Sequence, residues 1–328
     1  MPCRRAVIDS ASIFFFGYAM LALLTLPASG QSSRQVPRPD HVVIVIEENK
    51  AYAQIIGSSS APYINALATQ GALFSESFAL SHPSQPNYLA LFSGSTQGLK
   101  DNSCPHSFPG DNLASELIAG GFTFAGYSES LPAIGFSGCR SGNYTRKHNP
   151  WVNFSNLPAS VNLPMTSFPA DFRSLPTVAF VIPDLQNDMH DGSIQAGDEW
   201  LREHLEAYVS WAQTNNSLLV VTFDEDNGLD RNHIPTLMVG AMVQPGTYPD
   251  RINHYGLLRT LEDMFGVPYA GYSAGASPVL RIWKSADLVR KAVPLSSSGD
   301  AAITEPGTTN DSRASSGRRR RHGSGHVP

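Results

Sequence analysis

Basic residues are few in the body of this chain. Residues 31–291 hold 16 Lys and Arg against 24 Asp and Glu, a net charge of −8. Proteins that bind nucleic acid usually carry a basic surface that neutralises phosphates. The composition therefore argues against nucleic-acid binding, and it is compatible with carboxylates gathered around a cation.

Long apolar runs are also lacking, except at the amino terminus. Residues 13–26 are mostly apolar, follow Arg4 and Arg5, and precede small residues at 28–30. This pattern is typical of a signal peptide cleaved near Gly30, and the run is short for a stable membrane span. We expect a secreted or periplasmic protein with no stable membrane span, and an amino-terminal membrane anchor is the alternative.

Cysteine is scarce, with three residues in the chain. Cys3 would leave with the signal peptide, so Cys104 and Cys139 can pair only with each other. An exported protein meets an oxidising compartment, which favours a disulfide between them over two free thiols.

Internal repeats are absent, so we interpret residues 31–291 as one domain. Residues near 102–174 are rich in Gly, Pro, Ser and Asn, which is typical of an inserted loop region. Residues 292–328 are rich in Ser, Gly and Thr and include five arginines. Such a composition cannot bury enough apolar surface to fold, so we predict a disordered tail.

Apolar runs alternate with amphipathic segments along the domain. Expected strands lie at 41–46, 122–127, 178–182, 218–223 and 234–239, and expected helices at 62–69, 112–119, 198–211 and 254–265. This alternation predicts an α/β fold with a doubly wound, mostly parallel sheet and helices on both faces.

Acidic residues follow three of the expected strands. Glu48 and Asn49 follow the first strand, Asp184 follows the strand at 178–182, and Asp224 and Glu225 follow the strand at 218–223. In an open α/β sheet the ligand site lies at the carboxyl ends of the strands. Converging carboxylates repel one another unless a cation neutralises them, so we predict a metal site. Each segment taken alone is also compatible with a helix cap or a solvated loop.

Ser84 is the candidate nucleophile. Pro86 suits the first turn of a helix, which places Ser84 just before its amino terminus. Free N–H groups and partial positive charge there favour an alkoxide and bind phosphate oxygens. A plain N-cap serine is the alternative.

Histidines supply further candidates, namely His148, His190, His233 and His254. Each could be a metal ligand, a donor to a phosphate oxygen or the general acid for a leaving alcohol. A lone histidine is more often a surface or capping residue, so the pattern alone does not choose among them.

Taken together, the motifs resemble the phosphoesterase family that contains acid phosphatases and non-specific phospholipases C, within the alkaline phosphatase superfamily. The matching stretches occur in the family order, at 45–49, 84–87, 184–190, 224–228 with His233, and 254–262. The resemblance implies an alkaline-phosphatase-like fold and the hydrolysis of phosphate esters.

The resemblance also implies roles for individual residues. Ser84 takes the position of the nucleophile that forms a covalent phosphoenzyme. The implied metal ligands are Glu48, Asn49, Ser84, Asp224 and Glu225. An oxygen-rich ligand set favours a divalent cation such as Mg, Mn, Ca or Zn, without choosing among them.

The remaining candidates act on the substrate. His190 and His254 are the candidates for assisting the leaving group, and Asn87, Asp184, His148 and His233 for binding the substrate. We expect a small-molecule phosphate ester as the partner; the sequence gives no indication of oligomeric state.

Two features favour an acid phosphatase that acts on soluble monoesters. The phospholipase pattern has Arg where this chain has Tyr88, and the chain is short for such a phospholipase. A phospholipase C-type phosphodiesterase and a secreted binding protein without catalysis are the alternatives.

Overall fold

The computed structural model describes residues 36–285. The predicted signal peptide and the predicted disordered tail lie outside these residues. Within the described part, no helix has both the length and the apolar character that a membrane span requires.

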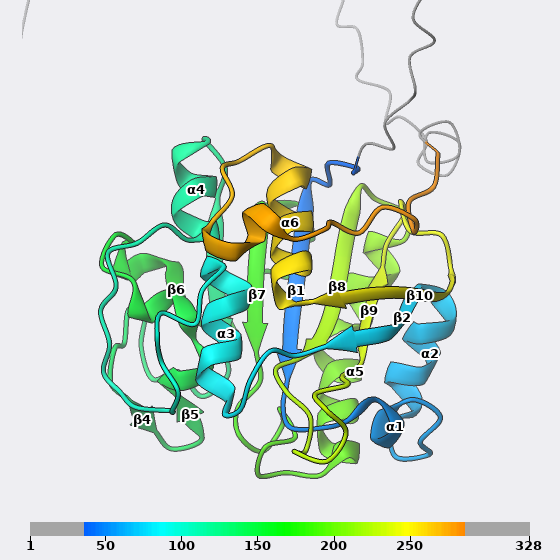
Figure 1. The fold of residues 1–328 in the computed structure, drawn as a ribbon, viewed down its shortest axis with the longest axis horizontal. Coiled ribbons are helices and arrows are strands. Elements are labelled where there is room, and N and C mark those ends of the chain that lie inside the picture. Colours follow the sequence, from blue (N-terminus) through cyan, green and yellow to red (C-terminus); the bar gives the residue numbers. More distant parts are fainter. Residues whose placement is uncertain (1–35, 286–328) are drawn as a thin grey trace, which may run out of the picture.

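An eight-stranded sheet forms the centre of the molecule, in the strand order β10-β2-β9-β8-β1-β7-β3-β6 (Figure 1). Its strands are β1 (His41–Glu47), β2 (Ala72–Phe78), β3 (Phe124–Ser128), β6 (Asn162–Pro164), β7 (Val178–Ile182), β8 (Ser217–Phe223), β9 (Thr236–Val239) and β10 (Gly246–Asn253). β9 pairs antiparallel with β8 and β2, and the other neighbouring strands pair in parallel. The short strands β4 (Arg140–Ser141) and β5 (Tyr144–Thr145) form a separate hairpin.

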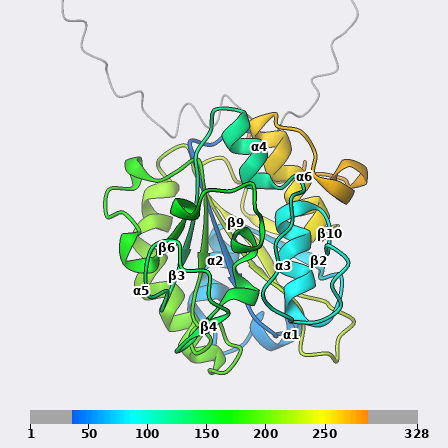
Figure 2. The ribbon, with the colours of Figure 1, turned by 90° about the vertical axis from the view of Figure 1, so that its left-hand side faces the viewer.

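Helices cover both faces of this sheet (Figures 1 and 2). They are α1 (Tyr52–Ile55), α2 (Pro62–Gln70), α3 (Ser84–Ser93), α4 (Leu113–Ala119), α5 (Ile194–Ala212) and α6 (His254–Phe265). α3, α4 and α6 pack on the face that receives Ile44 of β1, and α1, α2 and α5 on the face that receives Val43 and Val45. Both faces are buried, which explains the unbroken apolar run of β1. The predicted fold class is confirmed.

The predicted helices and strands differ from the observed ones mainly in the residues at which they begin, and in two strands that were not expected. α5 begins at Ile194, before the expected 198, because the Ser193 hydroxyl caps it by accepting the Ala196 N–H. β2 and β10 were not predicted from the apolar pattern. β10 is an edge strand with exposed residues and a register shift between Tyr248 and Arg251, so its sequence lacks a long apolar run.

The region 102–174 is not simply a loop inserted outside the sheet. It supplies α4, β3 and β6, of which β3 pairs with the central strand β7. Short 3-10 turns fill most of the stretch from 146 to 174, which accounts for its Pro and Ser content. The predicted disulfide between Cys104 and Cys139 is present and closes part of this region.

Glu262 is a buried carboxylate in α6, away from the acidic segments. Its Oε1 accepts the Ala270 N–H at 2.7 Å, and its Oε2 accepts the Ser273 hydroxyl at 2.6 Å. Burial raises the pKa of Glu262 to about 7. These contacts hold the turn after α6 at the cost of burying a charge at high pH.

The substitution Glu262→Gln should flatten the pH dependence of stability. The folded state holds the Glu262 proton up to a higher pH than the unfolded state does, so the free energy of unfolding should fall as pH rises from about 5 to about 8. The Gln oxygen can accept the Ala270 N–H and the Gln amide can donate to the Ser273 oxygen, and the side chain does not ionise, so the fall should be smaller in the variant. Urea denaturation at several pH values measures this, and equal slopes for both proteins would contradict the account.

Candidate active site

The three acidic segments lie side by side at the carboxyl ends of β1, β7 and β8, which are neighbours in the sheet. The Glu48 N–H donates to the Asp188 carbonyl at 2.8 Å, and the Asp224 N–H donates to the Glu47 carbonyl at 2.9 Å. These bonds extend the parallel pairing past the strand ends. The ends of the three strands therefore lie together at one edge of the sheet.

Asn49 ties the first segment to the third. Its backbone has a φ of 57°, a left-handed conformation that Asn adopts more readily than most residues. In this turn the Asn49 N–H donates to Asp224 Oδ1 at 3.1 Å, and its side-chain amide donates to Glu48 Oε2 at 3.1 Å. The turn thereby holds the side chains of Glu48 and Asp224 on either side of Asn49.

Ser84 reaches the same cluster from the start of α3. It is the first helical residue, and Pro83 before it occupies the N-cap position without a side-chain cap. Its buried Oγ donates to Glu48 Oε2 at 3.1 Å and lies 3.3 Å from Glu225 Oε1. Ser84 is thus not an N-cap serine, because its hydroxyl is directed at two carboxylates.

Asn87 fixes the loop that leads into α3. Its side-chain carbonyl accepts the N–H groups of Leu80 and Ser81, both at 3.1 Å. Its amide donates to the Ser81 carbonyl at 2.8 Å and approaches Glu225 Oε2 at 3.4 Å. Asn87 is therefore close to the cluster, but most of its hydrogen-bonding capacity is used within the protein.

His82, which the sequence analysis did not select, lies in this loop. Its Nδ1 is 2.8 Å from Glu225 Oε2, and its Nε2 is 3.2 Å from Asp226 Oδ1. Its side chain is 44% exposed, so the ring stands at the rim of the cluster. The signal that could have found it is its position two residues before Ser84.

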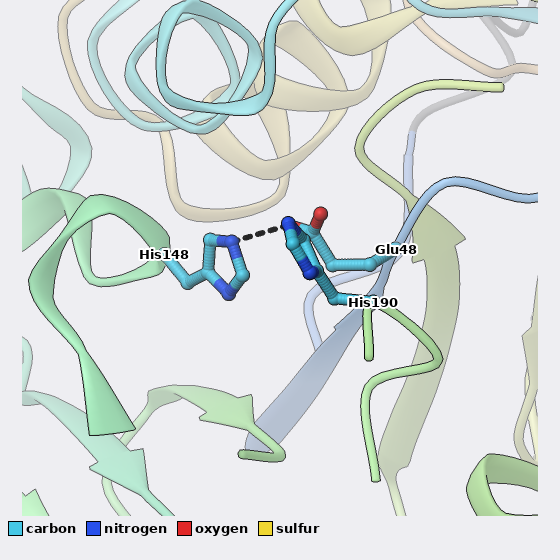
Figure 3. A group of neighbouring side chains, drawn as sticks. All are labelled: Glu48, His148 and His190. Atoms are coloured by element: carbon cyan, nitrogen blue, oxygen red, sulfur yellow. Dashed lines mark ion pairs between the residues drawn. The ribbon is translucent and has the colours of Figure 1, made fainter. Parts of the chain in front are cut away.

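His148 enters the cluster from the 3-10 turn Arg146–His148 (Figure 3). Its Nε2 lies 2.8 Å from Glu48 Oε1 and its Nδ1 lies 3.0 Å from Asp188 Oδ2, and its ring stacks on Tyr88 at 5.0 Å. Neither contact has hydrogen-bond geometry, so both are ion-pair contacts. Burial lowers the pKa of His148, but Glu48 and Asp188 together raise it above its ordinary value.

His190 lies next to His148 on the loop after β7 (Figure 3). Its backbone N–H donates to Asp188 Oδ1 at 2.8 Å. Ligand atoms of Glu48, His148 and His190 lie within 4.8 Å of one another, so these three side chains form a possible metal-binding group.

The charges in the cluster are strongly perturbed. Burial raises the pKa of Asp224 well above its usual value, and burial followed by the nearby Glu48 raises the pKa of Glu225 to about 7. Burial also acts to raise the pKa of Glu48, but His148 lowers it to about 2. The cluster therefore has more buried carboxylates than basic partners.

A divalent cation fits this donor set. Within the described part of the chain, two carboxylate oxygens of this set, Glu48 Oε1 and Asp224 Oδ2, are buried without a hydrogen-bond partner. A buried carboxylate oxygen without a partner is costly unless a cation or water binds it. The carboxylates of Glu48, Asp224 and Glu225 and the Ser84 hydroxyl, joined by the contacts above, supply oxygen donors that suit a hard or borderline divalent cation. Asn49 contacts two of these carboxylates through its N–H groups.

Two predicted residues are not brought into the cluster. Asp184 Oδ2 accepts the Ser130 hydroxyl at 2.6 Å, and its Oδ1 accepts the Gln186 N–H at 3.0 Å. It caps the turn that returns the chain to β1, and Asp188 takes the position near Glu48 instead. His233 is stacked between the rings of Tyr52 and Phe78. Its ring nitrogens lie near the Ser75 carbonyl and the Asp230 carboxylate, which are not part of the cluster.

His254, the first residue of α6, contacts the backbone of the segment that carries Asp224. Its Nε2 is 2.7 Å from the backbone carbonyl of Asp224, which can only accept a hydrogen bond. Burial lowers the pKa of His254 to about 4, so the ring is neutral near pH 7. In this arrangement His254 positions the segment that carries Asp224.

Known proteins are similar to this chain in sequence. The sequence profile of the Phosphoesterase family matches residues 58–268. A phosphatidylinositol-3-phosphatase from Mycobacterium tuberculosis is 54% identical over 289 residues, which cover 86% of this chain and 96% of that protein. An acid phosphatase from Aspergillus fumigatus is 32% identical, over 64% of this chain and 52% of that protein.

Two further proteins are similar to this chain at lower sequence identity. The non-specific phospholipase C5 of Arabidopsis thaliana is 26% identical, over 53% of this chain and 34% of that protein. The chain thus spans about half of the fungal phosphatase and a third of the plant phospholipase. A solved structure of a protein in the alkaline phosphatase superfamily from Vibrio parahaemolyticus superposes on this chain with a TM-score of 0.55 and 12% sequence identity. The match covers 76% of this chain and 72% of that one, so the two share the fold.

The resemblance inferred from the motifs is therefore confirmed: this chain belongs to the Phosphoesterase family and is a hydrolase of phosphate esters.

Proposed function

We propose that this protein is a secreted, metal-dependent phosphatase that hydrolyses phosphate monoesters through a phosphoserine at Ser84. The observation that carries the proposal is the direction of the Ser84 hydroxyl. It lies at the amino terminus of α3 and points to Glu48 and Glu225 rather than to a capping position.

The surroundings of Ser84 suit a nucleophile. Its proton is directed at carboxylate oxygens, so the alkoxide would form next to groups that accept the proton. The first N–H groups of α3 have no intrahelical partners, and they favour the negative charge of a phosphate group. Pro83 and Pro86 have no N–H and the Gln85 N–H is bound by Asn102 Oδ1, so the N–H that the first turn offers is that of Ser84.

Glu48, Asn49, Ser84, Asp224 and Glu225 would hold the divalent cation. When bound, such a cation lowers the pKa of the serine hydroxyl and offsets charge on the phosphate oxygens. Asn49 ties the backbone of this set together, because its N–H and its amide bind two of the carboxylates.

The reaction requires two displacements at phosphorus. The Ser84 oxygen forms a bond to phosphorus as the bond to the leaving alcohol breaks, and the alcohol takes a proton. A water molecule then breaks the bond between phosphorus and Ser84. His82 is better placed than His254 to exchange that proton, because it is partly exposed at the rim and bound to Glu225, whereas His254 is buried against a backbone carbonyl.

The substrate class is proposed from two lines of support. A relative named phosphatidylinositol-3-phosphatase matches nearly its whole length, and Tyr88 packs on His148 where the phospholipase pattern has Arg. We therefore propose a phosphomonoester, including the 3-phosphate of an inositol lipid. The disulfide between Cys104 and Cys139 supports export to an oxidising compartment.

Ser84→Ala should reduce kcat by at least about 10³-fold, because no other hydroxyl replaces the nucleophile. The change removes one buried oxygen from a crowded carboxylate cluster, so the melting temperature should not fall. Steady-state hydrolysis of p-nitrophenyl phosphate and thermal unfolding measure both effects. Ser93→Ala, a buried serine of the same helix that bonds to the Leu89 carbonyl, is the matched control and should stay active. Ordinary turnover by Ser84→Ala would contradict the proposal.

Removal of divalent metal should abolish hydrolysis, because the buried carboxylates lose the charge that balances them. The protein is treated with EDTA, dialysed, checked for metal by mass spectrometry and assayed with Mg, Mn, Ca or Zn added singly. At least one cation should restore activity, with an unchanged circular dichroism spectrum throughout. Full activity in verified metal-free protein would rule out the metal requirement.

A substrate screen separates the proposed phosphatase from its alternatives. The protein should release phosphate from p-nitrophenyl phosphate and from a short-chain phosphatidylinositol 3-phosphate, and should act at least about 10-fold more slowly on p-nitrophenyl phosphorylcholine. A preference for the diester would indicate a phospholipase C-type enzyme. No hydrolysis of any ester, with any cation and at any pH, would indicate a binding protein.

A further inference from the structure

Lys147 lies beside the carboxylate cluster, and the reaction described above gives it no role. It precedes His148 in the 3-10 turn Arg146–His148 and is partly buried. Its Nζ is 3.0 Å from His190 Nε2, the hydrogen-bond contact that its ammonium makes among the described residues.

The ring of His190 orients this ammonium. His190 Nδ1 is 2.7 Å from Asp191 Oδ1, and a carboxylate oxygen accepts a hydrogen bond, so Nδ1 carries the proton. The lone pair of the neutral ring is then at Nε2, where it accepts from Lys147. Asp191, His190 and Lys147 thus form a chain of contacts that ends in a positive charge.

Neighbouring basic residues are bound elsewhere. Lys50 Nζ donates to the Met189 carbonyl at 2.7 Å. The guanidinium of Arg146 donates to Asn153 and to three backbone carbonyls. Lys147 differs from Arg146, because its ammonium has one neutral partner and retains N–H groups for an anion. Lys50 also retains N–H groups, but its partner is a backbone carbonyl, whereas Lys147 is held by the side chain of His190.

The charge of Lys147 acts on both carboxylates that Ser84 contacts. Burial raises the pKa of Glu225, and the charge of Lys147 opposes that rise. Burial also acts to raise the pKa of Glu48, but His148 and, to a smaller extent, Lys147 lower it. The contacts place the ammonium beside Ser84: Lys147 Nζ is 3.0 Å from His190, a ligand atom of His190 lies within 4.8 Å of a Glu48 carboxylate oxygen, and Glu48 accepts the Ser84 hydroxyl.

The same contact bears on the possible metal-binding group of Glu48, His148 and His190. Both ring nitrogens of His190 are engaged, one by Asp191 and the other by Lys147. A metal ion on His190 would have to displace one of them. The ammonium and a cation in this group would also repel each other at short range.

We propose that Lys147 binds the phosphate group of the substrate, that His190 and Asp191 position it, and that its ammonium takes the place of a metal ion on His190. The proposal rests on the proposed function of Ser84. It leaves the oxygen-rich set around Asp224 as the site of a single metal ion, and it makes His190 a positioning residue rather than the acid for the leaving group.

The test compares metal-loaded wild type with Lys147→Gln, Lys147→Arg and Asp191→Asn. The readouts are kcat and KM for p-nitrophenyl phosphate, the inhibition constant of inorganic phosphate and the number of metal ions per chain. Lys147→Gln should raise KM and the inhibition constant roughly 10- to 100-fold, the range for a lost charge-assisted hydrogen bond, with a smaller effect on kcat. Lys147→Arg should recover most of the affinity, and Asp191→Asn should weaken it by a smaller factor.

Lys284→Gln is the matched control, because Lys284 donates to the Ala241 carbonyl beyond the far end of β9 and the substitution changes the net charge equally. It should leave both constants unchanged. An unchanged inhibition constant in Lys147→Gln, or two metal ions per chain in the wild type, would overturn the proposal.

Failure of the proposed function would be distinguishable from failure of this inference. Calorimetric titration of inorganic phosphate into metal-loaded Ser84→Ala, with and without Lys147→Gln, needs no turnover. Weaker phosphate binding in the double variant supports the role of Lys147 even if Ser84 is not the nucleophile. Equal binding contradicts that role even if Ser84 is.

Discussion

The repulsion among buried carboxylates at the ends of three parallel strands is the constraint on which the rest of the site depends. Glu48, Asp224 and Glu225 lie within one small region because β1 and β8 are neighbours and because Asn49 links their ends. Ionised carboxylates at such distances in a dry interior are unstable unless positive charge is present. His82, His148, Lys50 and Lys147 lie around these carboxylates, but Asp224 Oδ2 has no hydrogen-bond partner among the described residues. A divalent cation bound there would complete the balance.

The fold provides the rigidity that this arrangement needs. The central strands are buried on both faces, so the carboxyl ends of β1, β7 and β8 cannot shift apart without opening the core. α3 presses Ser84 into the cluster, and His254 holds the backbone of Asp224 from α6. The side chains that carry the chemistry are thus placed by regular secondary structure, which keeps them in register with one another.

The sequence predicted the fold and the core of the site because both depend on local patterns. Apolar runs followed by acidic residues mark buried strands that end at a common edge, and this placed Glu48, Asn49, Asp224 and Glu225 together. The sequence pattern could not distinguish Asp184 from Asp188, because the choice depends on the turn after β7. In that turn the Asp184 carboxylate accepts the Gln186 N–H, and the Asp188 carbonyl accepts the N–H of Glu48 at the end of β1. His233 was misplaced for a related reason: stacking between Tyr52 and Phe78 is a tertiary contact without a local signal.

The central claim is that Ser84 becomes covalently phosphorylated during turnover. The most direct measurement is to quench the metal-loaded protein with acid during hydrolysis of p-nitrophenyl phosphate and to map phosphorylation by peptide mass spectrometry. The account predicts one phosphoryl group per chain, located on Ser84. Phosphorylation at another residue, or rapid turnover with no covalent phosphate detectable in the quenched protein, would contradict it.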